Sequence, residues 1–295
     1  MTVDLHIHTV ASGDGEFSPQ EIIQFAKANQ LQAIAITDHD SINSVEAALY
    51  WGKKHGIEVI PGCEFSSIYK EKWLHVLGYF IDYNHPDIKQ WCDKIEKVRK
   101  ENVDAQIVKL REAGFYLDKD KVIENGSQPM PISYSRAIFS DHRNNNNQMV
   151  NQYRSQENYQ LRFCLDWIVT GQPYNAPQYI PAVKDVICLI IRSGGVPVLA
   201  HPAATLSIDD DPLLKDLLEM GLMGIEAFTT WHTKEQEDHY YQFCQENGVL
   251  ATCGSDFHGK SKPHIHIGQV KNNGYKVVER LTNLSHMHKR SDALA

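Results

Sequence analysis

The stretch that decides the fold is Asp4-Leu5-His6-Ile7-His8-Thr9, close to the N-terminus. Residues 2–6 have the composition of a short strand, and side chains two positions apart on a strand point the same way. His6 and His8 can therefore bind one cation, and Asp14, from the loop that follows, can reach a neighbouring position. The stretch predicts a strand that ends at a metal site.

A strand followed by a histidine or an acid recurs along the chain. The further examples are Thr37-Asp38-His39-Asp40, Gly62-Cys63-Glu64, Leu74-His75, Ala200-His201-Pro202 and Gly254-Ser255-Asp256-Phe257-His258. Predicted helices alternate with these strands, and the continuous apolar run 33–37 is typical of a strand in a parallel sheet, buried on both faces. A closed parallel barrel is the simplest fold that brings such strand ends together, because they share one rim.

The alternation stops near residue 86 and resumes at Pro181. Between these points the apolar spacing predicts one long amphipathic helix ending at Gly114, then shorter helices near 119–124, 133–140 and 157–170. The tract Arg143-Asn144-Asn145-Asn146-Asn147 is polar throughout and is expected to be a mobile loop. We therefore predict a barrel domain from 1–85 and 181–284, a helical insertion at 86–180 and a flexible C-terminal tail at 285–295.

Composition limits the classes of function. The chain has 295 residues, 42% of them hydrophobic and 22% charged, and no apolar run approaches the roughly 20 residues that span a bilayer. We see no signal peptide and expect a cytoplasmic protein that does not bind membranes. The net charge of −8 argues against long duplex nucleic acid as the main partner, but leaves open a small phosphorylated substrate or a short single strand.

The histidines and the cysteines of the chain indicate different roles. The fifteen histidines are a surplus that metal ligation would explain. The six cysteines are scattered without CxxC spacing, so we expect reduced, mostly buried thiols.

Nine side chains are candidate metal ligands: His6, His8, Asp14, His39, Glu64, His75, His201, Asp256 and His258. Nine exceed the needs of one ion and suit two or three divalent ions, with Mn²⁺, Fe²⁺ or Zn²⁺ favoured by imidazole and carboxylate ligands. Ions about 3.5–4 Å apart can hold a shared hydroxide as nucleophile and neutralise the oxygens of a phosphoryl group.

Taken together, these blocks resemble the PHP family, named for polymerase and histidinol phosphatase. The resemblance covers about residues 1–82 and 181–270, with every expected block present in order. It implies a distorted (β/α)7 barrel with a trinuclear metal site. The ligand groups that it implies are His6, His8, Glu64 and Asp256 for the first ion, Asp14, His39 and His258 for the second, and Glu64 as a bridge with His75 and His201 for the third. The family often has Ser-Asp-Gly where this chain has Ser12-Gly13-Asp14-Gly15.

The branch of the family with a helical insertion includes phosphatases of nucleoside 3′,5′-bisphosphates and 5′-to-3′ exonucleases of short RNA. We expect a metal-dependent phosphoesterase that removes a phosphate from a small nucleotide through a metal-bridging hydroxide, with Asp256 or His201 as proton donor. The alternatives are a 5′-to-3′ exonuclease on short single-stranded RNA or DNA, then a histidinol-phosphatase-like enzyme, then a non-catalytic metal-bound scaffold. Hydrolysis of a C–N bond is a further rival, although no lysine at a strand end suits it.

Four further side chains are candidates for binding the substrate: Arg136, Lys72, Lys260 and His232. Arg136 lies in the insertion, in the segment comparable to one where the branch often carries an Arg-Pro-His block, although Pro and His are missing here. Trp231 and Phe257 could stack on a base. Asp38 either orients the imidazole of His39 or caps the following turn.

Overall fold

The computed structural model describes residues 2–123, 129–156, 158–169, 180–270 and 274–292, with the backbone alone for 288–292. These residues form two compact units, one of Met1–Cys92 with Ile180–Ala295 and the other of Asp93–Tyr179. Each unit encloses apolar clusters of its own, so we describe the barrel unit and the helical unit separately. None of the described helices combines the length and the apolar character needed to cross a bilayer.

The barrel unit is built on one sheet whose strands follow each other in chain order. The strands are β1 (Thr2–Ile7), β2 (Leu31–Ile36), β3 (Glu58–Tyr69), β4 (Lys72–Tyr79), β5 (Val196–Leu199), β6 (Gly224–Thr229) and β7 (Leu250–Gly254). The first strand returns to the end of the last, because the His8 N–H donates to Phe257 O at 3.0 Å and Ile7 bridges Phe257. The sheet is thus a nearly closed barrel, which confirms the expected distorted (β/α)7 fold.

One strand runs against the expected direction. β4 pairs antiparallel with both β3 and β5, whereas the other neighbours pair in parallel, so the expectation of an all-parallel barrel was wrong here. β3 and β4 form a hairpin whose turn residues, Lys70 and Glu71, have φ of 47° and 63°. The hairpin extends β3 to Tyr69, so Glu64 lies within a strand and not beyond its end.

Helices cover the barrel. They are α1 (Pro19–Ala28), α2 (Val45–His55), α8 (Val183–Arg192), α9 (Asp211–Glu219), α10 (Lys234–Asn247) and α11 (Lys276–Asp292), with short 3-10 turns η1 (Val10–Ser12), η5 (Pro202–Ala204) and η6 (Gly259–Ser261). α1 begins with a capping box of Ser18 and Glu21 and packs Ile22 and Ile23 among the buried residues that include Ile34. α11 continues through Asp292, so a tail from residue 285 was the wrong expectation for that stretch, and 293–295 lie outside the described residues.

The helical unit contains most of α3 (Pro86–Glu112), which begins in the barrel unit. The remaining elements are α4 (Lys119–Val122), α5 (Pro131–Ser140), η3 (His142–Asn144), α6 (Gln148–Arg154), α7 (Tyr159–Phe163) and the π-helical η4 (Cys164–Val169). Their apolar faces form one cluster around Ile107, Ile138 and Phe163. The ends of two helices predicted here, at 124, 157 and 170, lie outside the described residues.

The asparagine tract is folded, contrary to the expectation of a mobile loop. Asn144 is completely buried: its Oδ1 accepts from the Tyr116 N–H at 2.9 Å, and its Nδ2 donates to Tyr116 O and Ile138 O, both at 2.7 Å. Asn147 caps α6 by accepting from the Val150 N–H at 3.2 Å. Backbone groups remote in sequence supply the partners that the tract itself lacks.

Candidate metal centre

The barrel unit brings all nine predicted ligand residues into one continuous cluster. His6 lies near the end of β1 and His8 follows that strand, while Glu64 and His75 lie on β3 and β4. The others follow strands: Asp14 after β1 and the turn η1, His39 after β2, His201 after β5, and Asp256 and His258 after β7. Strand ends and loops of a single barrel rim therefore position the whole set.

Glu64 lies at the centre of the cluster and is completely buried. Its carboxylate oxygens lie within 3.2 Å of nitrogens on five imidazoles, those of His6, His8, His39, His75 and His201. One carboxylate thus faces ligands of each predicted group, as a bridging ligand would.

Asp256 completes the first predicted group. Its Oδ1 lies 3.1 Å from His8 Nε2 and 3.4 Å from His6 Nε2, and the two Nε2 atoms are 3.1 Å apart. Together with Glu64 they form a set of four buried ligand atoms that one ion can contact.

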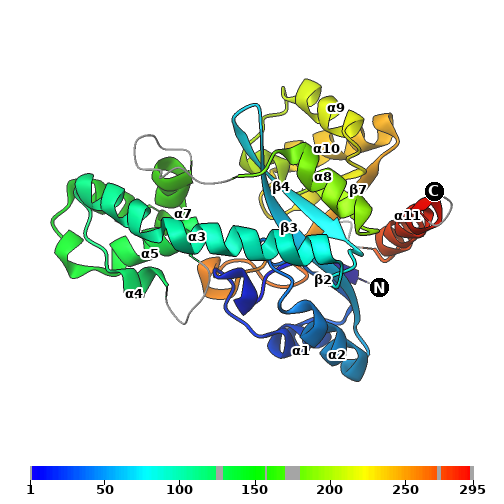
Figure 1. Cartoon of the computed structure of the whole chain (residues 1–295), viewed down its shortest axis with the longest axis horizontal. Helices are drawn as coiled ribbons and strands as arrows, with labels where there is room; N and C mark the ends of the chain where they lie inside the picture. Colours follow the sequence, from blue (N-terminus) through cyan, green and yellow to red (C-terminus); the bar gives the residue numbers. More distant parts are fainter. Residues whose placement is uncertain (1, 124–128, 157, 170–179, 271–273, 293–295) are drawn as a thin grey trace. The chain divides into compact units, whose positions relative to one another are not determined.

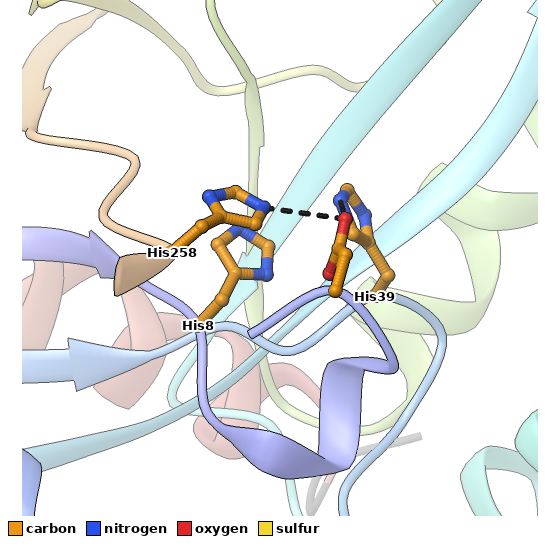
Figure 2. Close-up of side chains that lie close together, drawn as sticks. His8, His39 and His258 are labelled. Carbon is orange, nitrogen blue, oxygen red and sulfur yellow. Dashed lines mark ion pairs between the residues drawn. The ribbon is translucent and has the colours of Figure 1, made fainter. Parts of the chain in front are cut away.

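Figure 2 shows the imidazoles of His8, His39 and His258 lying close together. Asp14 Oδ2 lies 3.4 Å from His258 Nε2 and 3.6 Å from His39 Nε2. Gly13 precedes Asp14 with a φ of 82°, a left-handed conformation that accommodates the extra residue of this turn. The geometry also places His8 in this second set, and groups His39 with Glu64 and His75.

Sequence reasoning missed Glu226, a buried glutamate on β6. His6 Nδ1 donates to its Oε1 at 3.0 Å, and the His201 backbone N–H donates to its Oε2 at 2.9 Å. Because a carboxylate only accepts, Nδ1 of His6 carries a proton, and Nε2 is the atom that would bind a cation in the cluster. An acid inside the otherwise apolar run 224–228 was the signal that could have revealed it.

Other ligands are oriented in a similar way. His258 Nδ1 donates to the backbone oxygen of Asp256 at 2.8 Å, which leaves Nε2 facing Asp14. Ser12 Oγ lies 2.9 Å from His8 Nδ1 and accepts from the His39 N–H at 3.0 Å. The rings are thereby fixed before any cation binds.

The cluster has the atoms that a cation would satisfy. Glu64 Oε2, Asp256 Oδ1, Asp14 Oδ1 and His75 Nδ1 are buried, and none has a hydrogen-bond partner within the described part of the chain. Buried polar atoms rarely lack partners. Imidazole nitrogens and carboxylate oxygens, with no thiolate among them, suit divalent Mn, Fe or Zn. The residues present therefore fit a metal centre.

Electrostatics agree with this arrangement. Burial opposes the ionisation of Glu64, yet the surrounding imidazoles, His39 first among them, hold the pKa of its carboxyl well below its usual range. Burial also opposes protonation of His6, yet the nearby carboxylates, led by Glu226, raise its pKa well above the usual value. Burial lowers the pKa of His258, which favours the neutral imidazole that metals bind.

Two of the nine residues adopt backbone conformations that are unusual for their type. His201 has a φ of 23° and Asp256 a φ of 55°. Such strain costs on the order of 1–3 kcal/mol and persists where the surroundings hold it. The contact from the His201 N–H to Glu226 is one of the interactions that do so.

Asp256 also has two neighbours that the metal prediction did not include. Trp231 Nε1 donates to Asp256 Oδ2 at 2.5 Å, and the Lys262 ammonium contacts the same oxygen. Trp231, proposed from sequence to stack on a base, thus has its indole N–H engaged. Phe257 is buried and packs 5.9 Å from the Phe17 ring, so a role in base stacking is not supported.

The predicted substrate-binding lysines lie at the surface with acidic partners. Lys72 pairs with Asp210 at 3.2 Å, and the largely exposed Lys260 pairs with Glu16. Arg136 lies on α5 of the helical unit, and its role stays a prediction.

His232 was the wrong choice for a substrate contact. Its Nδ1 donates to Ala227 O at 2.9 Å and its Nε2 accepts from the Ala203 N–H at 3.3 Å, so both ring nitrogens are engaged. Asp38, for which two roles were open, accepts from Thr9 N–H at 2.6 Å and from the Ser44 hydroxyl. It therefore ties the residues after β1 to the turn before α2.

A profile of the PHP domain matches residues 4–166. The chain is 27% identical over 279 residues to a phosphoribosyl 1,2-cyclic phosphate 1,2-diphosphodiesterase of Eggerthella lenta, covering 94% of this chain and 99% of the relative. It is 25% identical over 274 residues to a 3′,5′-nucleoside bisphosphate phosphatase of Chromobacterium violaceum, covering 91% of each. A 5′-3′ exoribonuclease of Haemophilus influenzae is 26% identical over 260 residues, covering 86% of this chain and 89% of the relative.

Two solved structures share the fold. A proposed metal-dependent phosphoesterase of Bifidobacterium adolescentis has a TM-score of 0.79 at 22% identity and covers 96% of both chains. An amidohydrolase of Chromobacterium violaceum, solved with bound sulfate and no metal, has a TM-score of 0.80 at 22% identity, covering 96% of this chain and 97% of its own. At this identity the likeness concerns the fold alone.

Proposed function

The chain belongs to the PHP domain family, and from this premise we propose that it is a metal-dependent phosphoesterase that hydrolyses a phosphomonoester of a small nucleotide, of the nucleoside 3′,5′-bisphosphate kind. The observation that carries the proposal is the cluster around Glu64, where nine imidazoles and carboxylates meet with several buried atoms lacking hydrogen-bond partners within the described chain.

Three sets of residues would hold two or three divalent ions. The sets are His6, His8, Glu64 and Asp256; Asp14, His39 and His258 with His8; and Glu64, His75 and His39 with His201 beside them. Bound ions of Mn, Fe or Zn would supply Lewis acidity, which activates water and neutralises charge on phosphoryl oxygens.

The protein's own groups hold this arrangement and handle the proton. Glu226 fixes the ring of His6 and the backbone of His201. Of the two candidates for donating a proton to the leaving oxygen, the geometry favours His201. Trp231 and Lys262 engage Oδ2 of Asp256, and its Oδ1 faces His6 and His8, where a metal ion would bind.

The small-nucleotide substrate is supported by the bisphosphatase relative and by the net charge of −8, which disfavours long nucleic acid. The relative from Eggerthella lenta supports a second candidate, the opening of a cyclic sugar phosphate. The exoribonuclease relatives keep the third candidate, 5′-to-3′ cleavage of short single strands. In all three reactions a nucleophile attacks phosphorus, so the same metal centre serves each of them. They differ in the part of the substrate that must fit beside the metal centre.

Three features from the sequence stay predictions. They are the assignment of 86–180 as an insertion domain within a barrel domain of 1–85 and 181–284, the binding of substrate by Arg136, and a cytoplasmic location.

Elemental analysis of the purified protein, paired with phosphate release from adenosine 3′,5′-bisphosphate with and without added Mn²⁺, tests the proposal. We expect two or three ions per chain and release that a chelator abolishes. Bound metal without release would redirect the assay to the cyclic sugar phosphate and to a 5′-phosphorylated RNA pentamer. Less than one ion per chain after reconstitution would contradict the metal centre and favour the scaffold alternative.

A further inference from the structure

Lys262 is the one lysine or arginine that is buried among the residues whose side chains the structure describes. It lies in the loop after β7, on the same loop as Asp256 and His258. Burying an ammonium costs free energy unless negative charge compensates it. The position of Lys262 therefore calls for an explanation in terms of its anionic partners.

The described partner of the ammonium is a single carboxylate oxygen. Lys262 Nζ contacts Asp256 Oδ2 and lies 4.8 Å from the centroid of the Trp231 ring. An ammonium has three N–H donors, and this contact uses one of them. Asp256 turns its other oxygen, Oδ1, towards His6 and His8, where a metal ion would share its charge.

The ammonium lies at the accessible edge of the cluster. The side chains of His6, His8 and Glu64 are 0% exposed and form its floor. Those of His201 and Lys262 are each 10% exposed, and that of His75 is 27% exposed. Trp231 lies between His201 and Lys262 at this edge, because its ring is 5.5 Å from that of His201 and under the Lys262 ammonium. A ligand that reaches His201 from solvent therefore arrives beside Trp231, the ring over which the Lys262 ammonium lies.

With metal ions in the cluster, the carboxylates of Glu64, Asp14 and Asp256 would be shared among the ions, and the carboxylate that contacts the ammonium, Asp256, would compensate its charge only in part. The missing negative charge is that of a phosphoryl group, whose oxygens accept charge-assisted hydrogen bonds. We propose that Lys262 is a substrate-binding residue whose ammonium contacts a phosphoryl oxygen of the phosphate ester. This inference deepens the proposed function and rests on it for the identity of the anion.

Lys260, which the sequence also offered as a substrate contact, provides the comparison, because it lies two residues earlier on the same loop and its exposed ammonium already pairs with Glu16. Its side chain is 89% exposed and pairs with Glu16 at the surface. Lys260→Met and Lys262→Met remove the same charge and leave the same side-chain volume. If the lysines act by general electrostatic attraction, either substitution should weaken phosphate binding. If Lys262 contacts the phosphate directly, only Lys262→Met should weaken it.

The experiment loads wild type, Lys260→Met and Lys262→Met with Mn²⁺, measures metal content by elemental analysis, and titrates inorganic phosphate by calorimetry. We expect unchanged metal content in all three. The Kd for phosphate should rise about 10- to 100-fold in Lys262→Met, as for a lost charge-assisted hydrogen bond, and less than about twofold in Lys260→Met.

Loss of metal from Lys262→Met alone would overturn the proposal, because the lysine would then serve only to hold Asp256. An unchanged phosphate Kd in Lys262→Met would overturn it as well. If Lys262→Met does not fold, Lys262→Gln, which still can donate to Asp256, takes its place under the same criteria. The phosphate titration needs no turnover. If wild type binds phosphate but hydrolyses no ester, the proposed function is refuted. The role of Lys262 is then still decided by the phosphate Kd of Lys262→Met.

Discussion

Glu64 in the barrel unit and Asn144 in the helical unit are both polar and completely buried, yet their surroundings differ. Asn144 makes three hydrogen bonds to the backbone of Tyr116 and Ile138, which satisfy its amide. Glu64 faces five imidazoles, and its Oε2 has no hydrogen-bond partner among the described residues. A satisfied buried group stabilises the fold, whereas an unsatisfied one that is surrounded by ligand atoms indicates a place for something else to bind.

The largest effect should follow from neutralising the centre of the cluster. Glu64→Gln removes the negative charge that two of the three ligand sets share, so we expect metal affinity to fall at least about 100-fold and kcat/KM on the order of 10³-fold. Elemental analysis and phosphate release measure both. Glu58→Gln, on the exposed start of the same strand, is the control and should behave as wild type. A Glu64→Gln protein with full metal content would mean that Glu64 is a structural residue like Asn144.

A smaller effect should follow from Glu226→Gln. The carboxylate accepts from both His6 Nδ1 and the His201 N–H, but in the amide an NH₂ group replaces one oxygen and faces one of these two donors. We expect a 10- to 100-fold loss of metal affinity with the fold retained, as for other groups that orient ligands. Calorimetric titration of the metal-free protein with Mn²⁺ measures this. Glu235→Gln, at the exposed start of α10, should leave the affinity unchanged.

Most of the site residues could be predicted from the sequence because they lie at or after the end of a strand, and that pattern is local; Glu64 and His75 instead lie within β3 and β4. The direction of β4 could not be predicted from the sequence, because an apolar run such as 74–79 has the same pattern whichever way the strand runs. A two-residue hairpin is normally signalled by Asn-Gly or Asp-Gly, whose residues tolerate positive φ. Here Lys70 and Glu71 adopt that conformation, so the signal was missing.

Partners that are distant in sequence explain the other differences. The asparagine tract has the composition of a loop, and only the folded chain brings the Tyr116 backbone to Asn144. Lys260 and Lys262 are equivalent in the sequence, yet the loop exposes the first and buries the second against Asp256. Composition identifies such residues without showing which of them has a partner.

In the helical unit, substitution of Asn144, whose amide has all its hydrogen bonds, should lower stability without affecting the metal centre. Asn144→Ala leaves the Tyr116 N–H without its acceptor and removes the amide donor from Tyr116 O and Ile138 O, so we expect the free energy of unfolding to fall by about 2 kcal/mol. Urea unfolding followed by circular dichroism measures the change, and metal content should match wild type. Asn145→Ala, at the exposed neighbouring position, is the control, and its free energy of unfolding should fall by less than about 0.5 kcal/mol. Equal losses in the two variants would contradict the structural role of Asn144.

The smallest effect concerns His232, a satisfied side chain within the barrel unit. His232→Gln should cost about 1 kcal/mol at pH 8, from lost hydrogen bonds, and leave KM unchanged. Burial lowers the pKa of His232 below its ordinary 6.5, so below that pH the unfolded chain takes up a proton that the folded chain resists. The stability advantage of wild type over His232→Gln should therefore shrink as pH falls through about 6.5. Urea unfolding of both proteins from pH 8 to pH 5 measures this difference, in which the other histidines cancel. An advantage that stays constant or grows, or a raised KM, would instead return His232 to the substrate-binding residues.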